Sequence, residues 1–176
     1  MDHFREDIIG RRSTGLSNVF YFAGWALVVV FGIYAVLMLQ VVMLQFSPGA
    51  LILFLLSAAA AVLVYFAKDE MKAEYEYTFT NGTLDFAKVL RGARRKELGS
   101  MNVANVAACG HVAHPSFKRY ISMKDADRKN WFLNRDGNLF YFYYEKEGRK
   151  HIIVIEPSEE MVGLIRLYVP AGVYQG

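Results

Sequence analysis

The sequence predicts a membrane-anchored α+β protein: two transmembrane helices in a hairpin, then an antiparallel β-barrel or sandwich of about seven strands with a C-terminal helix. The first observation is that residues 13–67 contain no Asp, Glu, Lys, Arg or His. The second is that much of the chain after residue 68 alternates polar and apolar side chains with the period of β-strands. This pattern excludes a single soluble globule, a disordered chain and a many-pass transporter. One cysteine excludes a disulfide-rich domain.

The uncharged stretch is divided into two helices by Ser47-Pro48-Gly49. Proline removes an N–H donor and glycine accepts turn dihedrals, so the pair ends a helix. We therefore expect a transmembrane hairpin over 19–67, with helices over about 19–46 and 50–67. A hydrocarbon core about 30 Å thick needs about 20 helical residues, and each segment in lipid must satisfy its own backbone hydrogen bonds.

Positive charges flank both outer ends of this hairpin, whereas its connecting turn carries none. The cations are Arg5, Arg11 and Arg12 before the hairpin and Lys68 and Lys72 after it. Since Lys and Arg concentrate on the cytoplasmic side, we predict an integral protein of the cell membrane with both termini cytoplasmic. Residues 1–18 would form a cytoplasmic N-terminal segment. A cleaved signal peptide is disfavoured because the apolar stretch is too long and acidic residues precede it.

Residues 68–176 form the predicted cytoplasmic domain, and its first strand is 73–80. Tyr75, Tyr77 and Phe79 alternate with polar residues there. Asn81-Gly82 predicts a tight hairpin, because both residues accept positive φ, and a second strand returns over 83–89. A basic turn over 91–96 leads into a third strand that ends near Leu98.

The rest of the domain is predicted from shorter patterns. A helical turn is expected over 100–106 and a loop over 113–128. Ser158 can cap a final helix, and the glutamates that follow it favour the positive end of the helix dipole. That helix has one apolar face and ends before Pro170. The four remaining strands are expected over 107–112, 131–133, 139–145 and 151–156.

Four strands, three strands and a C-terminal helix, in that order, resemble a pleckstrin-homology-like (PH-like) domain. The residues that carry the resemblance are Tyr75-x-Tyr-x-Phe-Thr-Asn-Gly-x-Leu-x-Phe, Arg91-Gly-Ala-Arg-Arg-Lys-Glu-Leu and Ile152-Ile-Val-Ile-Glu-Pro-Ser-Glu-Glu, which together cover most of 72–170. The whole layout is similar to bacterial membrane proteins in which a two-helix hairpin precedes such a domain. The resemblance implies a binding or scaffolding module without catalytic machinery. PH-like folds bind lipids, peptides and proteins alike, so the fold does not choose among them.

One group of cations is a candidate lipid-contact site, and we call it the basic cluster. It consists of Lys88, Arg91, Arg94, Arg95 and Lys96. Each cation close to anionic lipid contributes about 1 kcal/mol to membrane binding. The alternative is a solvated hairpin whose charges help to fix the topology.

Metal, nucleic-acid and catalytic sites are not expected. Cys109, His111 and His114, with the distant His151, lack the ligand spacing of a structural zinc site. The aromatic run 139–144 is better explained by packing than by base stacking, because the net charge is only +3. No phosphate-binding loop, nucleophile elbow or metalloprotease helix occurs. We expect no cofactor and no enzymatic activity.

The leading hypothesis is a cytoplasm-facing binding module anchored by the hairpin. Its partners would be the lipid bilayer, through the basic cluster, and a protein or peptide, through an open sheet edge or the groove beside the last helix. The alternative is a structural subunit whose hairpin packs inside a larger membrane complex. The sequence does not identify the partner or the oligomeric state.

Overall fold

The computed structural model describes residues 2–12 and 14–176, and it divides into two compact units. The sheet unit runs up to Arg11 and again from Glu74 to Gly176, and the helical unit is Arg12–Ala73. The helical unit is therefore an insertion in the chain of the sheet unit. Residues 1 and 13, which belong to the predicted N-terminal segment, lie outside the described residues.

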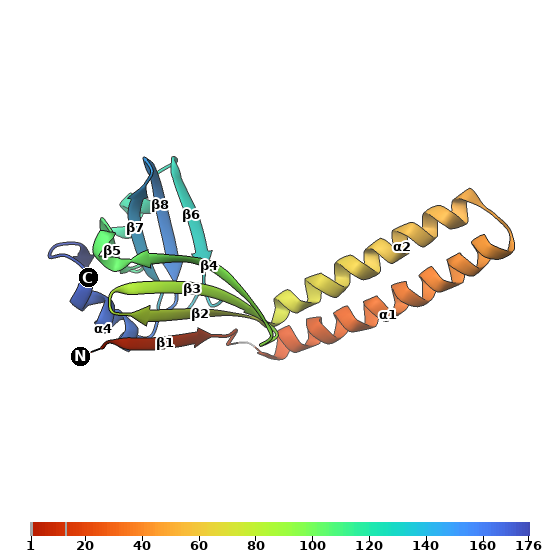
Figure 1. The fold of residues 1–176 in the computed structure, drawn as a ribbon, viewed down its shortest axis with the longest axis horizontal. Helices are drawn as coiled ribbons and strands as arrows, with labels where there is room; N and C mark the ends of the chain where they lie inside the picture. The colour runs from red at the N-terminus through yellow and green to blue at the C-terminus, as the bar shows by residue number, and fades with distance from the viewer. Residues whose placement is uncertain (1, 13) are drawn as a thin grey trace. The chain divides into compact units, whose positions relative to one another are not determined.

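The helical unit is an antiparallel pair of long helices (Figure 1). Helix α1 is Thr14–Leu44, helix α2 is Pro48–Ala67, and the 3₁₀ helix η1 covers Lys68–Lys72. Pro48 is the first residue of α2, where a missing N–H donor costs no helical hydrogen bond. Helix α1 begins before the predicted residue 19, because the uncharged residues ahead of Val19 continue the same helix.

Both helices present large apolar side chains to their surroundings. Phe20, Leu37 and Leu63 are 60%, 49% and 70% exposed, whereas a soluble protein buries most such side chains of a long apolar helix. The candidate spans are 30 and 25 residues long and apolar enough to cross a membrane. Their length and composition suggest membrane association.

The first sheet has the strand order β1-β2-β3-β4. Its strands are β1 (Phe4–Ile9), β2 (Ala73–Thr80), β3 (Thr83–Leu90) and β4 (Arg94–Asn102). The predicted tight turn between β2 and β3 is confirmed, with φ of 47° at Asn81 and 91° at Gly82. Strand β4 extends beyond Leu98 through a bulge opposite Phe86 and Ala87. The helical turn predicted over 100–106 is correspondingly reduced to the 3₁₀ helix η2 (Val103–Asn105).

Strand β1 was not predicted. It lies antiparallel to β2, with pairs from Phe4 opposite Thr80 to Ile9 opposite Tyr75. In β1 only Asp7 is buried, while Phe4 and Ile8 are exposed. It is an edge strand, and backbone and polar contacts hold it in the sheet. Its sequence therefore lacks the alternation of apolar and polar residues from which a strand is predicted.

The second sheet has the order β6-β8-β7-β5-β9. Its strands are β5 (Ala108–His111), β6 (Ala126–Trp131), β7 (Phe140–Lys146), β8 (Arg149–Ile155) and β9 (Tyr174–Gln175). The loop predicted over 113–128 is wrong, because this stretch contains helix α3 (Phe117–Ile121) and the start of β6. Strand β6 is a polar edge strand parallel to β8, so a search for apolar alternation found only its end. Nine strands occur in the described residues, against about seven expected.

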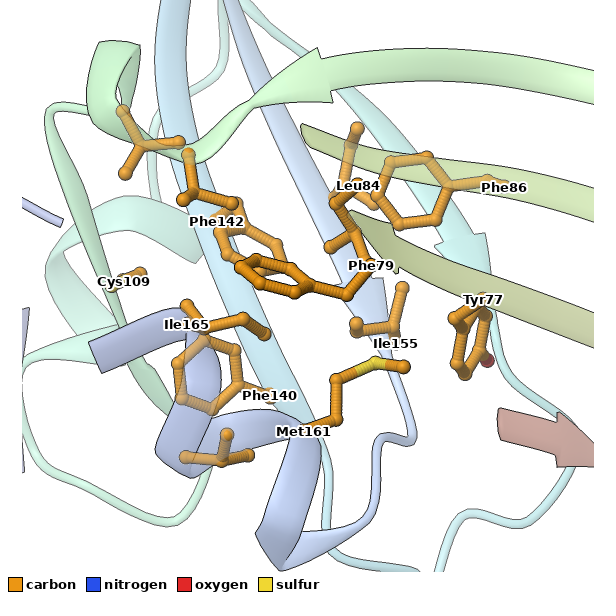
Figure 2. Packing of buried hydrophobic residues seen from close by; sticks show 14 residues of the cluster. Tyr77, Phe79, Leu84, Phe86, Cys109, Phe140, Phe142, Ile155, Met161 and Ile165 are labelled. Carbon is orange, nitrogen blue, oxygen red and sulfur yellow. The ribbon is translucent and has the colours of Figure 1, made fainter. Parts of the chain in front are cut away.

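The core lies between the inner faces of the two sheets and is completed by helix α4 (Glu159–Tyr168). Phe79 and Phe142 come from the two sheets, while Met161 and Ile165 reach the same cluster from α4 (Figure 2). The predicted cap is confirmed, since the Ser158 side chain accepts a hydrogen bond from the backbone N–H of Met161. A second buried cluster on the other face of β7 contains Tyr141 and Tyr143 and explains why this strand is aromatic on both faces.

Candidate functional site

The β3–β4 hairpin brings the basic cluster together at one end of the first sheet. Arg91 lies in the turn with φ of 55°, next to Gly92 with φ of 65°. Arg94, Arg95 and Lys96, which were expected in the turn, instead begin β4. Lys88 lies directly opposite Lys96. Two like charges in this position lie close together and repel each other. Their proximity makes the electrostatic potential at this end of the sheet positive.

The five cations do not have the same surroundings. Four of them are exposed and Lys88 is half-buried. Arg95 forms an ion pair with Glu76 of β2, which is mostly buried. The structure therefore places all five predicted residues on one hairpin, with the charge of Arg95 partly compensated by its neighbour.

Both chain connections to the helical unit leave the first sheet at the end that carries this hairpin turn. Strand β1 ends at Ile9 opposite Tyr75, close to the start of β2. The Asn81-Gly82 turn joins β2 to β3 at the other end, so β3 returns to the first end and the Arg91 turn lies there. The β3–β4 turn and the two connections thus share one end of the sheet (Figure 1).

Polar contacts join β1 and the residue before it to the last helix and its cap, and sequence reasoning missed all of them. Asp7 accepts hydrogen bonds from the backbone N–H and the hydroxyl of Ser158, at 2.7 and 3.0 Å. Arg5 forms an ion pair of 2.6 Å with Glu160. The ring of His3 lies 3.0 Å from the Tyr168 hydroxyl. No local pattern reveals such contacts, because the partners are more than 150 residues apart.

A buried carboxylate fixes the residue that follows β1. Glu156 is 4% exposed, and the side-chain amide of Asn134 donates to its two oxygens at 3.1 and 3.0 Å. The same amide nitrogen is 3.1 Å from the backbone oxygen of Gly10. Gly137 packs so closely that a β-carbon there would lie 2.3 Å from Glu156 Oε1. We interpret this cluster as structural, because the Glu156 carboxylate and the Asn134 amide form hydrogen bonds within the protein.

The cysteine and histidines considered for zinc are not brought together. Cys109 is fully buried in the core, and burial raises the pKa of its thiol to about 12. His111 contacts Asn138 at 2.9 Å, and His114 contacts Ser116 at 2.8 Å. His151 lies on β8, stacked on Tyr144. Among the residues that the structure describes, no group of three or more His, Cys, Asp or Glu side chains is arranged to hold a metal ion.

A second cluster of charged and aromatic side chains lies where α2 ends and η1 begins. The Lys68 side chain is 0% exposed and forms an ion pair of 2.8 Å with Asp69. Its ammonium lies 4.4 Å from the ring centre of Trp25 and 4.2 Å from that of Tyr65. The ring of Tyr21 lies 5.6 Å from the same ammonium, so aromatic rings of both helices surround this cation.

Comparison with known proteins gives one informative result. No curated protein and no solved structure matches the chain. A family model described as "Bacterial PH-like domain (DUF6106)" matches residues 1–175. That match takes in strand β1, both apolar helices and the two sheets with their C-terminal helix. The chain belongs to this family of bacterial PH-like domain proteins.

Proposed function

We propose that this protein is a membrane-anchored, non-catalytic binding module whose sheet unit faces the cytoplasm and contacts anionic lipid through the basic cluster. The observation that carries the proposal is the shared sheet end. The cluster lies where both chain connections lead to the apolar helices. Short connections limit how far that end can move from a bilayer that the hairpin spans. Membership in a PH-like family supports a binding role rather than catalysis.

The pairing of β1 with β2 supports a topology in which both chain ends share one side of the membrane. Strand β1 precedes the hairpin and β2 follows it, yet the two are hydrogen-bonded neighbours. A hairpin that crosses the membrane twice would keep both of these strands on the same side of it. The Lys and Arg residues that flank the hairpin favour the cytoplasmic side.

Orientation can be tested in a Cys109→Ala background with single introduced cysteines and a membrane-impermeant maleimide in intact cells. Ser47→Cys lies between the helices, and Glu147→Cys lies in the β7–β8 turn. We expect labelling of the first variant from outside and of the second only after permeabilisation. Labelling of Glu147→Cys from outside would contradict the cytoplasmic orientation.

Lipid contact can be tested in the full chain, reconstituted into nanodiscs of phosphatidylcholine with or without phosphatidylglycerol. A spin label at Ala93→Cys, in the β3–β4 turn, reports whether the turn meets water or lipid. We expect protection from a water-soluble relaxing agent only with the anionic lipid, and less protection in high salt. Equal exposure in both lipids would overturn the lipid contact.

A pair of charge reversals provides the specific control. Arg91→Glu with Arg94→Glu should abolish the protection, because both residues belong to the exposed part of the cluster. Lys118→Glu with Arg119→Glu changes the same charge on α3, which packs on the outer face of the second sheet. We expect protection to persist in this control variant. Crosslinks to a partner that lie only on α1 and α2 would instead favour the structural-subunit alternative.

A further inference from the structure

A cleft opens between β4 of the first sheet and the inner face of the second sheet. Its volume is about 360 Å³, which lies within the range of ligand-binding clefts. The apolar surface comes from Phe86, Trp131 and Ile153, of which Trp131 and Phe86 are in ring contact with centroids 4.8 Å apart. A cleft with an aromatic lining in an otherwise closed sandwich marks a place where the two sheets are not fully packed together.

A second hollow continues the cleft along β4. It has a volume of about 290 Å³ and is lined by Ser100, Met101 and Asn102 of that strand. Ser100, Tyr144 and Lys146 line both hollows. Together they form one groove that follows β4 from Leu98 to Asn102, and we call it the β4 groove.

The inner face of the second sheet changes from apolar to cationic as it enters this groove. On β7 and β8 the inward residues Phe142 and Ile153 belong to the core. Two residues nearer the β7–β8 turn on each strand, the groove is lined by Tyr144 and His151, and next to the turn by Lys146 and Arg149. Inward positions of a β-sandwich are ordinarily apolar. These polar residues therefore contribute to the groove rather than to the core.

The cations of the β4 groove outnumber its acids. Lys129, Lys146 and Arg149 line it together with two carboxylates, Glu145 and Glu147. Lys146 and Arg149 face each other directly in the strand register, and like charges in that position are destabilising. In the part of the chain that the structure describes, neither Lys146 nor Arg149 forms an ion pair with a carboxylate. An anionic partner would relieve this repulsion.

The strand beside the groove offers its backbone for pairing. Strand β4 is the last strand of the first sheet, and within the described residues no strand pairs with its outer edge. Its first half, Arg94–Glu97, is charged, which protects an edge against accidental pairing. From Leu98 to Asn102 it carries no charge. The unprotected half of the edge is the half that borders the groove.

We propose that the β4 groove binds an extended acidic peptide segment of a partner protein. The segment adds to the edge of β4 as a further strand, so that main-chain hydrogen bonds supply affinity. Its acidic side chains meet Lys129, Lys146 and Arg149, and an apolar side chain packs against Trp131. This site shares no residue with the basic cluster, so the lipid contact and the peptide site can fail independently.

The test uses the full chain in neutral phosphatidylcholine nanodiscs, which keeps anionic lipid out of the measurement. A displayed library of random heptapeptides is selected against this sample and counter-selected against Lys146→Glu/Arg149→Glu. We expect enriched peptides that carry two or more acidic residues alternating with apolar ones. Enrichment of nothing, or of basic peptides, would overturn the proposal.

Synthetic copies of an enriched peptide then test the mode of binding. Lys146→Glu/Arg149→Glu should weaken the affinity by about tenfold or more, because charge attraction becomes repulsion. Lys118→Glu/Arg119→Glu, on α3, should leave it unchanged. A loss of affinity in both variants would show that the peptide responds to overall charge and not to the groove.

Backbone methylation distinguishes strand addition from capture of side chains alone. Alternate amides of an added strand point toward β4, and the remaining ones point away. N-methylation of one alternate set should abolish binding, while methylation of the other set should preserve it. Equal tolerance of both methylated peptides would overturn strand addition. If free glutamate bound as tightly as the peptide, the groove would be a site for small anions instead.

Discussion

Asp7 and Ser158 are 151 positions apart, yet the Asp7 carboxylate accepts hydrogen bonds from both the backbone N–H and the hydroxyl of Ser158. The same hydroxyl accepts a bond from Met161 at the start of α4. Asp7 thus joins the first strand of the chain to the cap of its last helix. Since the helical unit is inserted between β1 and β2, this contact helps to hold β1 within the sheet unit, far from the rest of that unit in the sequence.

The first prediction concerns this contact. Asp7→Ala should lower the free energy of unfolding of the sheet unit by about 1–3 kcal/mol, because Ser158 loses a buried charged acceptor. Glu6→Ala, an exposed neighbour on the same strand, is the matched control and should change it by about 0.5 kcal/mol or less. Urea unfolding of the full chain in detergent, followed by Trp131 fluorescence in a Trp25→Phe background, measures both. Equal midpoints for the two variants would contradict the role of Asp7.

The second prediction concerns the discontinuous sheet unit. A chain in which residues 2–10 are joined to 74–176 by an Asn-Gly turn should fold without the apolar helices. Gly10 and Glu74 are already close, since a β-carbon on Gly10 would lie 3.9 Å from the Glu74 side chain. Residues 74–176 alone lack β1, leave the β2 edge open and lose the contacts of Asp7 and Gly10. They should melt at a lower temperature and associate through the open edge.

Circular dichroism and light scattering on the two purified proteins decide this prediction. We expect one cooperative thermal transition and a monomer for the joined chain. If residues 74–176 melted at the same temperature as the joined chain and stayed monomeric, β1 would be dispensable. The comparison also shows whether lipid or peptide assays can be carried out on a soluble form.

Features with strong local patterns were predictable from the sequence. The break at Pro48, the turn at Asn81-Gly82 and the cap at Ser158 each depend on residues within a few positions of one another. The structure confirms all three. Strands β7 and β8 are rich in aromatic and β-branched residues, and they were also found within two residues of their bounds.

Edge strands were not predictable, because they lack such a local pattern. Strands β1 and β6 are polar and partly exposed, and they are held by partners distant in the chain. The basic cluster was found because its residues are sequence neighbours. The β4 groove was not found, because it combines Leu98 and Ser100 of one sheet with Lys129, Lys146 and Arg149 of the other. Only the crossing of the two sheets brings these residues together.

The third prediction concerns the cation at the end of the helical hairpin. Lys68→Met should destabilise the hairpin, because it removes the ion-pair partner of Asp69, whose side chain is 6% exposed. Asp69→Asn in the same chain should restore part of the loss. The coupling energy between the two positions should be about 2 kcal/mol, the scale of contacting residues.

A double-mutant cycle measures this coupling. Unfolding of the full chain in detergent is followed through Trp25 in a Trp131→Phe background, since Trp25 contacts the Lys68 ammonium. Lys72→Met serves as a second cationic control at the same end of the unit. Strictly additive effects of Lys68→Met and Asp69→Asn would show that the pair makes no net contribution.

The fourth prediction concerns the single thiol. Cys109 is 0% exposed, and burial raises its pKa from 9.0 to about 12. At pH 8 the thiolate fraction in the folded protein is then about 10⁻⁴, and only the thiolate is nucleophilic. Iodoacetamide should label the native chain about a thousandfold more slowly than the urea-unfolded chain. Labelling of native protein at the unfolded rate would place the thiol at the surface.

The same pKa shift has a defined sign for stability. The folded state holds the proton of Cys109 up to about pH 12, whereas the unfolded state releases it near pH 9.0. The contribution of Cys109 to stability is therefore complete below pH 9.0 and is lost as the pH rises toward 12, by at most about 1.4 kcal/mol per pH unit. Burial also raises the pKa of Tyr77, so it acts in the same direction at somewhat higher pH. Urea unfolding at pH 8 and pH 10.5 should show lower stability at the higher pH, and Cys109→Ala should reduce that difference. An unchanged difference in Cys109→Ala would assign the alkaline loss to Tyr77 and other groups.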